Sequence, residues 1–252
     1  MASCPYYDLF ISYGRADSKP FVIDLSERLQ ASGLKVWVDI NDIPLGVDYQ
    51  QQINEGIERS HTFVFIISPH AVNSHHCRLE LDYALSLNKR IVTILQVETI
   101  SQEIWRQRFP LAPDTDWLDY QQKGLHSSFT NLPNSLRKIN WIGFRDGTDD
   151  PDAALHGLLE VLKRHQDYVY QHTHWLVQAL KWERRQRQTR DLLVDRDRQQ
   201  AKQWLVFRFE EEQPPCVPTD LHCEFITESI KNAQNLTSQV FLGYHALQAD
   251  LA

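Results

Sequence analysis

The chain has 252 residues, of which 42% are hydrophobic and 23% charged, and its formal net charge is −7. This composition is typical of a globular protein with one large or two smaller domains, and the acidic balance argues against a dedicated nucleic-acid-binding protein. No apolar run approaches the roughly 18 to 20 residues of a membrane span, and residues 1–5 lack the pattern of a signal peptide. The scattered cysteines show no CxxC spacing, which indicates reduced thiols in the cytoplasm.

The first 165 residues alternate between short apolar runs and amphipathic segments. Strands are predicted at 7–13, 34–38, 62–67, 90–95 and 139–144. Helices are predicted from Asp17 or Ser18 to Gly33, from Asp48, over 75–88 and from Asp150. The run 62–67 is almost wholly apolar, as in a parallel strand covered on both faces. The order predicts an α/β fold, with a five-stranded parallel sheet between two layers of helices and a less regular stretch over 98–137.

The pattern changes beyond about residue 166. Polar, Arg- and Gln-rich helix dominates, and a strand is suggested only at 204–207. Prolines at 214, 215 and 218 mark a break before another predicted helix over 219–233. The sequence therefore predicts two parts, a domain over 1–165 and a mainly helical extension or connector over 166–252.

Polar side chains gather at the end of the first predicted strand. Ser12 and Tyr13 close this strand, and Gly14 and Arg15 follow before the first helix. Ligands of open α/β sheets bind at the carboxyl ends of parallel strands. A binding site is therefore expected at this point.

Residues 6–165 resemble the TIR (Toll/interleukin-1 receptor) domain family, with several motifs in the family's order. The run 7–13 resembles box 1, and the strand and loop over 36–46 resemble the BB loop. Ser68, Ser74, Cys77 and Glu80-Leu81 are similar to the S…S-x-W-C-x-x-E-L signature of many bacterial TIR domains. The resemblance implies a flavodoxin-like fold.

Some TIR domains hydrolyse or cyclise NAD⁺, and the resemblance places Glu80 at the catalytic glutamate of those enzymes. Nicotinamide leaves NAD⁺ as a neutral molecule, so one carboxylate that stabilises the ribose cation is sufficient, and no cofactor is needed. Glu80 is expected in the first turn of its helix, next to the positive helix end. The resemblance further implies that NAD⁺ is contacted by Ser12, Tyr13, Gly14, Arg15, Trp37, Asp39, Asp42, Gly46 and His76.

His76 departs from the family's pattern, because enzymatic members often carry Trp at this position. NAD⁺ glycohydrolase activity in defence or signalling remains the leading interpretation, and the product, ADP-ribose or a cyclic isomer, stays open. The rival interpretation is a non-enzymatic scaffold that acts through contacts between TIR domains. Self-association through the loop 39–47 and a sensor domain or protein bound to 166–252 are further expectations.

Simpler interpretations stand beside these roles. Glu80 alone would be read as a surface acid at a helix start, Arg15 as a solvated cation and Trp37 as core packing. His70, His75, His76 and Cys77 cluster, but adjacent pairs on a helix cannot all face one ion, so no metal site is predicted. The segment 181–190 holds five basic residues against one acidic residue, and a solvated helix face is favoured there over a nucleic-acid or lipid surface.

Overall fold

The computed structural model describes residues 6–39 and 49–249, with side chains up to residue 236. The chain divides between Val169 and Tyr170 into two compact units, here called the N-terminal and the C-terminal unit. The division falls inside helix α10 (Gln166–Arg184), close to the boundary expected from the sequence.

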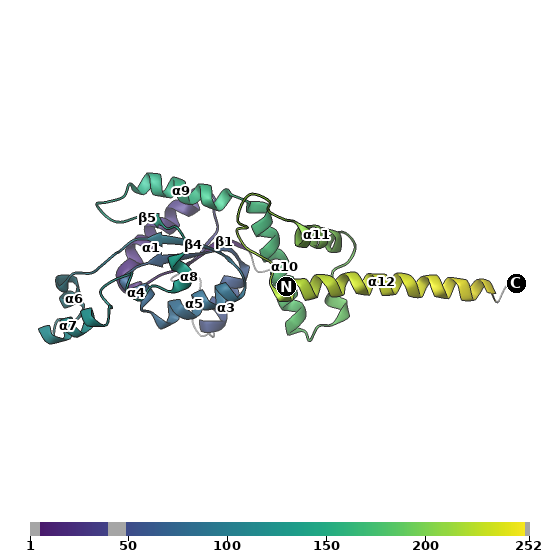
Figure 1. Ribbon diagram of the computed structural model, residues 1–252, viewed down its shortest axis with the longest axis horizontal. Coiled ribbons are helices and arrows are strands. Elements are labelled where there is room, and N and C mark those ends of the chain that lie inside the picture. Colours follow the sequence, from purple (N-terminus) through teal and green to yellow (C-terminus); the bar gives the residue numbers. More distant parts are fainter. Residues whose placement is uncertain (1–5, 40–48, 250–252) are drawn as a thin grey trace. The chain divides into compact units, whose positions relative to one another are not determined.

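The N-terminal unit is built on a five-stranded sheet (Figure 1). Its strands are β1 (Tyr7–Ser12), β2 (Val36–Trp37), β3 (Ser60–Ile67), β4 (Arg90–Leu95) and β5 (Ile142–Gly143). They run parallel in the order β2-β1-β3-β4-β5, which confirms the predicted fold class, although β5 is shorter than expected. The chain reverses direction across the sheet between β1 and β3, and such a switch point opens a crevice at the carboxyl ends of the two strands.

Helices cover both faces of this sheet, because successive side chains of a buried strand point to opposite sides. Leu9 and Ile11 of β1 pack with α1 (Arg15–Ala31) and α9 (Pro151–Lys163) in one apolar cluster. Phe10 points to the other face, where α3 (Tyr49–Arg59) and α5 (His75–Ser86) lie, and stacks on Trp37 with ring centroids 4.4 Å apart. Ser12 alternates with Ile11 and therefore shares the α3–α5 face with Phe10.

The start of α1 differs from the sequence prediction. The helix begins at Arg15 after Gly14, so Asp17 and Ser18 lie inside its first turn instead of capping it. The Asp17 carboxylate accepts hydrogen bonds from the Ser68 hydroxyl and the backbone N–H of His70, both at 2.8 Å. Asp17 thus holds the start of the short helix α4 (Pro69–Val72) against α1. The expected cap Asp48 lies outside the described residues.

The remaining helices lie in two stretches. The predicted irregular stretch contains α6 (Gln102–Arg108), α7 (Asp114–Gln122) and α8 (Asn134–Arg137). The C-terminal unit holds most of α10, the 3₁₀ turn Thr189–Asp191, α11 (Asp195–Val206) and α12 (Asp220–Ala249), so the predicted helical extension is confirmed. The strand suggested at 204–207 is wrong. Ala201 and Trp204, three residues apart, form the buried face of α11, which is the spacing of a helix.

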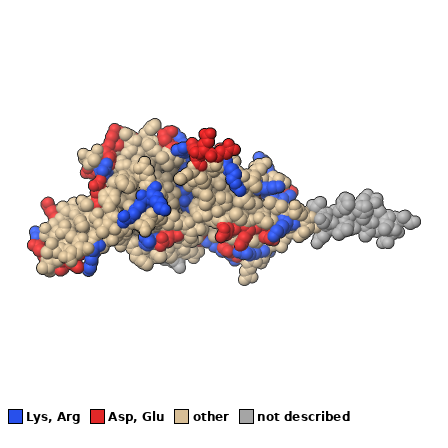
Figure 2. Space-filling model, viewed as in Figure 1, with Lys and Arg blue, Asp and Glu red and all other residues tan. Residues whose placement is uncertain are grey.

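No helix in the described part of the chain combines the length and the apolar character that crossing a membrane requires. On the face shown in Figure 2, acidic and basic side chains form small separate groups, and no extended surface carries a single sign.

A buried arginine joins the sheet to the end of α9. Arg90, at the start of β4, is 6% exposed, and its guanidinium donates to the Thr62 hydroxyl at 2.6 and 2.9 Å. It also donates to the carbonyls of Val161, Leu162 and Arg164 at 3.0 to 3.3 Å. The last carbonyls of a helix have no partner within the helix, and the negative helix end favours a cation. Arg90 therefore satisfies the end of α9 from within the core.

We predict that Arg90→Met lowers the free energy of unfolding of the N-terminal unit by about 2 to 4 kcal/mol, because several buried acceptors lose a charged donor at once. Arg106→Met is the control: that side chain is 56% exposed and its ion pair with Asp114 lies on the surface, so its loss costs under about 1 kcal/mol. Urea titration followed by tryptophan fluorescence measures both. Equal losses in the two variants would contradict the assigned role.

Candidate active site

Glu80 lies on the buried face of α5. Ser74 caps this helix by accepting the backbone N–H of Cys77, and Glu80 follows in the second turn. The expectation of a first-turn position was therefore wrong, and the effect of the positive helix end, which falls off within the first turn, does not explain this site. Cys77, Glu80, Leu81 and Ala84 form one inward-facing stripe, and Glu80 is only 8% exposed.

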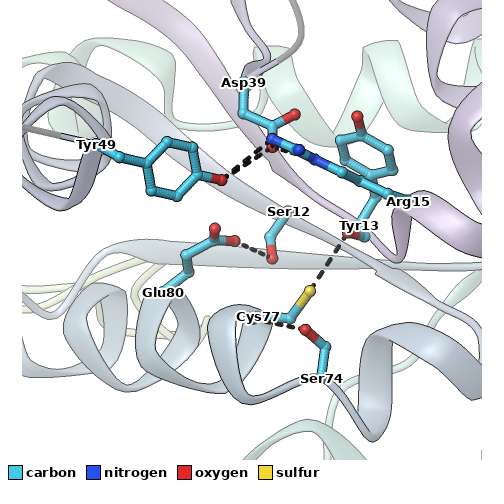
Figure 3. Close-up of polar contacts among 8 residues, drawn as sticks. All are labelled: Ser12, Tyr13, Arg15, Asp39, Tyr49, Ser74, Cys77 and Glu80. Atoms are coloured by element: carbon cyan, nitrogen blue, oxygen red, sulfur yellow. Dashed lines mark hydrogen bonds and ion pairs between the residues drawn. The ribbon is translucent and has the colours of Figure 1, made fainter. Parts of the chain in front are cut away.

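The Glu80 carboxylate meets the end of β1 (Figure 3). The Ser12 hydroxyl donates to its Oε2 at 2.6 Å. Burial, the largest effect, raises the pKa of Glu80 to about 7, and the carboxylate of Asp39 also raises it, whereas the Ser12 hydrogen bond and Arg15 lower it. The side chain can therefore hold or release a proton near neutral pH, as residues of active sites often do.

Arg15, Asp39 and Tyr49 form a polar cluster next to this pair. The Arg15 guanidinium donates from Nε to Oδ2 of Asp39 at 2.9 Å, and its Nη2 contacts the same oxygen. The Tyr49 hydroxyl donates to that oxygen at 3.3 Å, and burial together with Asp39 raises the pKa of Tyr49 to about 12. The Arg15 side chain is 56% exposed and the Asp39 side chain 13%, so the cluster reaches from the interior to the surface.

Tyr49 is a site residue that the sequence reasoning missed. It opens α3, the helix after the loop that follows β2, and its ring lies 5.9 Å below the Arg15 guanidinium. On its other side it faces the exposed ring of His76, with centroids 6.5 Å apart and planes nearly perpendicular. A feature of the sequence could have predicted this role: Tyr49 lies in the first turn of an amphipathic helix, just after the loop expected to border the site.

Tyr13 lies next to this cluster, largely buried. Burial first, and the Asp39 carboxylate second, raise the pKa of its phenol well above 10. Its hydroxyl and Oδ1 of Asp39 are both buried, and neither makes a hydrogen bond of ordinary length and angle to the described residues. The phenol and the carboxylate nevertheless interact, because a side-chain hydrogen bond with Asp39 is among the effects that raise the pKa of Tyr13.

Cys77 belongs to the packing beneath the site. Its thiol donates to the carbonyl of Tyr13 at 3.3 Å, and burial raises its pKa to about 12. A thiol in that state is a poor nucleophile at neutral pH. Among residues 6–39 and 49–236, no group of three or more His, Cys, Asp or Glu side chains is arranged to hold a metal ion.

The structure gives Trp37 and Gly14 packing roles. Trp37 is 3% exposed, lies on Phe10 and faces Gly56, where an added Cβ would approach the indole to 2.7 Å. At Gly14 a Cβ would lie 2.7 Å from the backbone nitrogen of Ala71, so only glycine allows α4 to approach the start of α1 this closely. The predicted site residues Asp42 and Gly46 lie outside the described residues.

Five of the predicted residues thus meet at the carboxyl end of β1: Ser12, Tyr13, Arg15, Asp39 and Glu80. A buried carboxylate that titrates near neutrality can stabilise a positive charge that develops on a substrate. The neighbouring guanidinium suits phosphate, and the buried acceptors suit sugar hydroxyls. The arrangement fits a nucleotide that carries a cationic group.

Part of the chain is similar to proteins of a known family. Residues 9–131 match the family model described as TIR domain. The chain is similar to 2′ cyclic ADP-D-ribose synthase AbTIR of Acinetobacter baumannii, at 35% identity over 78 residues, 31% of this chain and 29% of that protein. It is also similar to NAD(+) hydrolase TirS of Staphylococcus aureus, at 32% identity over 93 residues, 36% of this chain and 33% of that protein. The matches span about a third of these relatives' length.

Among solved structures, the TIR domain of the Toll-related receptor TRR-2 of Hydra magnipapillata matches with a TM-score of 0.44 and 20% identity, over 62% of this chain and 98% of that one. With the family match over 9–131 and the similarity to bacterial proteins that carry TIR in their names, the resemblance expected from the sequence is confirmed. Residues 9–131, just under half of the chain, therefore match the TIR domain family.

Proposed function

We propose that this chain cleaves the bond between nicotinamide and ribose in NAD⁺, with Glu80 as the catalytic carboxylate. The observation that carries the proposal is the burial of Glu80 against Ser12 at the carboxyl end of β1. A carboxylate is rarely buried without a cation directly paired to it, and a pKa near 7 lets it be charged when substrate binds. The relatives named as an NAD(+) hydrolase and a 2′ cyclic ADP-D-ribose synthase support this substrate.

The chemistry asks little of the protein beyond charge and position. The bond between the ribose C1′ and the pyridine nitrogen breaks, and neutral nicotinamide leaves with the electron pair. Ionised Glu80 stabilises the ribose cation that remains. A water oxygen then bonds to C1′ and loses a proton, which gives ADP-ribose. If a hydroxyl of the same molecule attacks C1′ instead, a cyclic isomer forms, and the described residues favour neither product.

The polar cluster supplies the remaining functions in this proposal. Arg15, more than half exposed, contacts the diphosphate, while Asp39 and Tyr13 receive ribose hydroxyls. Tyr49 and His76 face each other at the surface end of the cluster and offer two rings to the nicotinamide. Tyr49 thereby provides the larger aromatic surface that His76, in place of the expected Trp, does not.

A second candidate is a TIR scaffold without enzymatic activity. Two observations favour it. His76 stands where many enzymatic members carry Trp, and Arg15, which would bind phosphate, already forms an ion pair with Asp39. The two functions separate in one assay, because a scaffold releases no nicotinamide from NAD⁺ at any protein concentration.

We further propose that the protein acts in the cytoplasm, in defence or signalling, and that self-association raises its activity. The loop 39–47, expected to mediate assembly, lies beyond Asp39 outside the described residues. Among described surfaces, α6, α7 and the segment between them expose apolar side chains suited to a second copy: Ile104, Phe109, Leu111 and Leu118, between 42% and 97% exposed. The C-terminal unit takes part in assembly or in contact with a sensor, and not in the chemistry.

We predict that Glu80→Gln lowers nicotinamide release from NAD⁺ by at least about 10² to 10³-fold, because the transition state loses its counter-charge. Chromatography of the reaction mixture measures the release. Glu27→Gln, on the exposed face of α1, is the control and keeps native activity. Native-like release by a folded Glu80→Gln protein would remove Glu80 from the mechanism.

Glu80→Gln should also change how the free energy of unfolding depends on pH. The raised pKa of Glu80 means that the folded chain binds this proton more tightly than the unfolded chain. Its contribution to stability is therefore complete below about pH 4.5 and is lost as the pH rises through about 7. At pH 8 we expect Glu80→Gln to unfold at the same or a higher urea concentration than the native protein, which separates loss of charge from loss of fold.

We predict that kcat/KM for NAD⁺ cleavage rises with pH around a midpoint near 7, because it reports ionisation of Glu80 in the free enzyme. Ser12→Ala removes the hydrogen bond that lowers this pKa, so its midpoint moves to higher pH while activity above the midpoint is largely kept. Ser86→Ala, at the exposed end of α5, leaves the profile unchanged. An unshifted midpoint in Ser12→Ala would show that Ser12 does not tune the carboxylate.

We predict that specific activity rises with protein concentration over a hundredfold range, together with the mass measured by light scattering. Leu111→Asp weakens both effects, because this side chain is 97% exposed on the proposed surface. Val161→Asp, 39% exposed on α9 of the N-terminal unit, is the matched control. A monomer with constant specific activity would contradict self-association.

A further inference from the structure

We propose that the C-terminal unit carries a separate binding site for a nucleotide, held through its phosphate and its ribose hydroxyls. The site is a surface pocket of about 710 Å³ at the end of α10. Its lining residues are Arg184, Arg185, Gln186, Gln188, Arg190 and Asp191. The volume lies in the range of ordinary small-molecule sites. This proposal is independent of NAD⁺ cleavage in the N-terminal unit.

The lining is rich in guanidinium groups that suit phosphate. Arg185 is oriented by an ion pair, because its Nη1 donates to Oδ1 of Asp191 at 2.8 Å. Arg190 makes no ion pair with any residue that the structure describes, although five basic residues share this segment. Planar guanidiniums bind phosphate through paired hydrogen bonds. Arg190 thus adds to the pocket a positive charge that no described carboxylate pairs with.

Asp191 provides the second, independent sign of a ligand. Its side chain is only 9% exposed, and its Oδ2, a buried atom on this lining, has no hydrogen-bond partner among the described residues. A buried carboxylate oxygen without a donor is costly. In the proposal, the exposed guanidinium of Arg185, which lies on the same carboxylate, moves aside when the ligand binds, and a ribose hydroxyl then donates to Oδ2. A carboxylate that binds ribose hydroxyls beside a phosphate site is a general way to recognise nucleotides.

The backbone of the pocket is strained and firmly anchored. Gln186 and Arg187 both have φ of 57°, the left-handed region that residues other than glycine seldom adopt. The N–H of Arg187 donates to the carbonyl of Trp182 at 2.9 Å, and its guanidinium pairs with Glu224 of α12 at 2.8 Å. Trp182 is itself buried against Phe225. The turn that presents Arg185 and Arg190 is therefore preformed.

A single nucleotide fits these features better than a nucleic-acid strand. Arg187 is engaged by Glu224 and lies over the ring of Trp182, so it does not extend the charged surface. The lining contains no aromatic side chain on which successive bases could stack. One phosphate-binding group and one acceptor for ribose hydroxyls match one nucleotide.

Titration calorimetry on the full chain tests the site, with AMP, 2′,3′-dideoxy-AMP, pyrophosphate and a short single-stranded RNA as probes. We expect AMP to bind and the dideoxy analogue, which lacks the ribose hydroxyls, to bind at least about tenfold more weakly. Arg190→Gln weakens AMP binding by at least about tenfold. Arg196→Gln, the same change on exposed α11 outside the lining, leaves it unchanged. Arg15→Gln is titrated in parallel, because it weakens any AMP binding at the N-terminal site and leaves the binding event that Arg190→Gln weakens, which separates the two sites.

Asp191→Asn completes the test, because it removes the charge that accepts the hydroxyls and weakens AMP binding while pyrophosphate binding stays the same or strengthens. Circular dichroism checks its fold, and the dideoxy comparison in the native chain carries the same information if the variant unfolds. The proposal is overturned by equal affinities for AMP and its dideoxy analogue, by binding that survives Arg190→Gln, or by no binding at millimolar AMP. Tighter binding of RNA than of AMP would also overturn it and assign the surface to nucleic acid.

Discussion

The hydrogen bond from Ser12 to Glu80 is the contact on which the site of the N-terminal unit depends. It joins the last residue of a central strand to a carboxylate in the core-facing stripe of α5. Burying an ionised carboxylate is unfavourable, and here one hydroxyl and a guanidinium farther off offset burial only in part, so the pKa settles near 7. A stable core would place leucine at such a position. The chain instead has a carboxyl group whose ionised form is disfavoured by burial, which is typical of a residue with a functional role.

The packing around this pair is correspondingly strict. Gly14 lets α4 approach the start of α1, and Asp17 then binds the first turn of α4 through Ser68 and His70. Cys77 closes the floor by donating to the carbonyl of Tyr13. These contacts hold the end of β1 and the start of α5 in fixed relation, and preorganised groups of this kind stabilise a developing charge without rearranging.

The two units divide polar chemistry in different ways. In the N-terminal unit the side chain of Arg15 is exposed and that of Glu80 is buried. The desolvation penalty for a charged group is therefore small at Arg15 and large at Glu80. In the C-terminal unit the arginines stand on a strained turn over one buried carboxylate, Asp191. Within the described part of the chain, both arrangements leave a carboxylate oxygen without a hydrogen bond of ordinary geometry, Oδ1 of Asp39 in one and Oδ2 of Asp191 in the other. Sugar hydroxyls satisfy both in the proposals made above.

The sequence by itself determined the parallel α/β fold, because strands buried on both faces must be apolar throughout and the helices between them must show one apolar side. It also placed Ser12, Tyr13 and Arg15 at one edge of the sheet, since ligand sites form at the ends of parallel strands, and the resemblance to TIR domains added Asp39 and Glu80. Short motifs in a fixed order identified the TIR domain without any knowledge of contacts.

Only the tertiary structure decided the burial and the electrostatic environment of these residues. Periodicity alone could have shown that Glu80 shares a stripe with Cys77, Leu81 and Ala84, but whether that stripe is covered depends on β1 and α3, which are distant in sequence. The environment of Trp37 also depends on a distant residue, because its buried ring packs against Gly56, where a larger side chain would clash. Tyr49 belongs to the site because its hydroxyl contacts Asp39 and Arg15. Burial and electrostatic environment are sums over neighbours in space, and a linear pattern does not contain those neighbours.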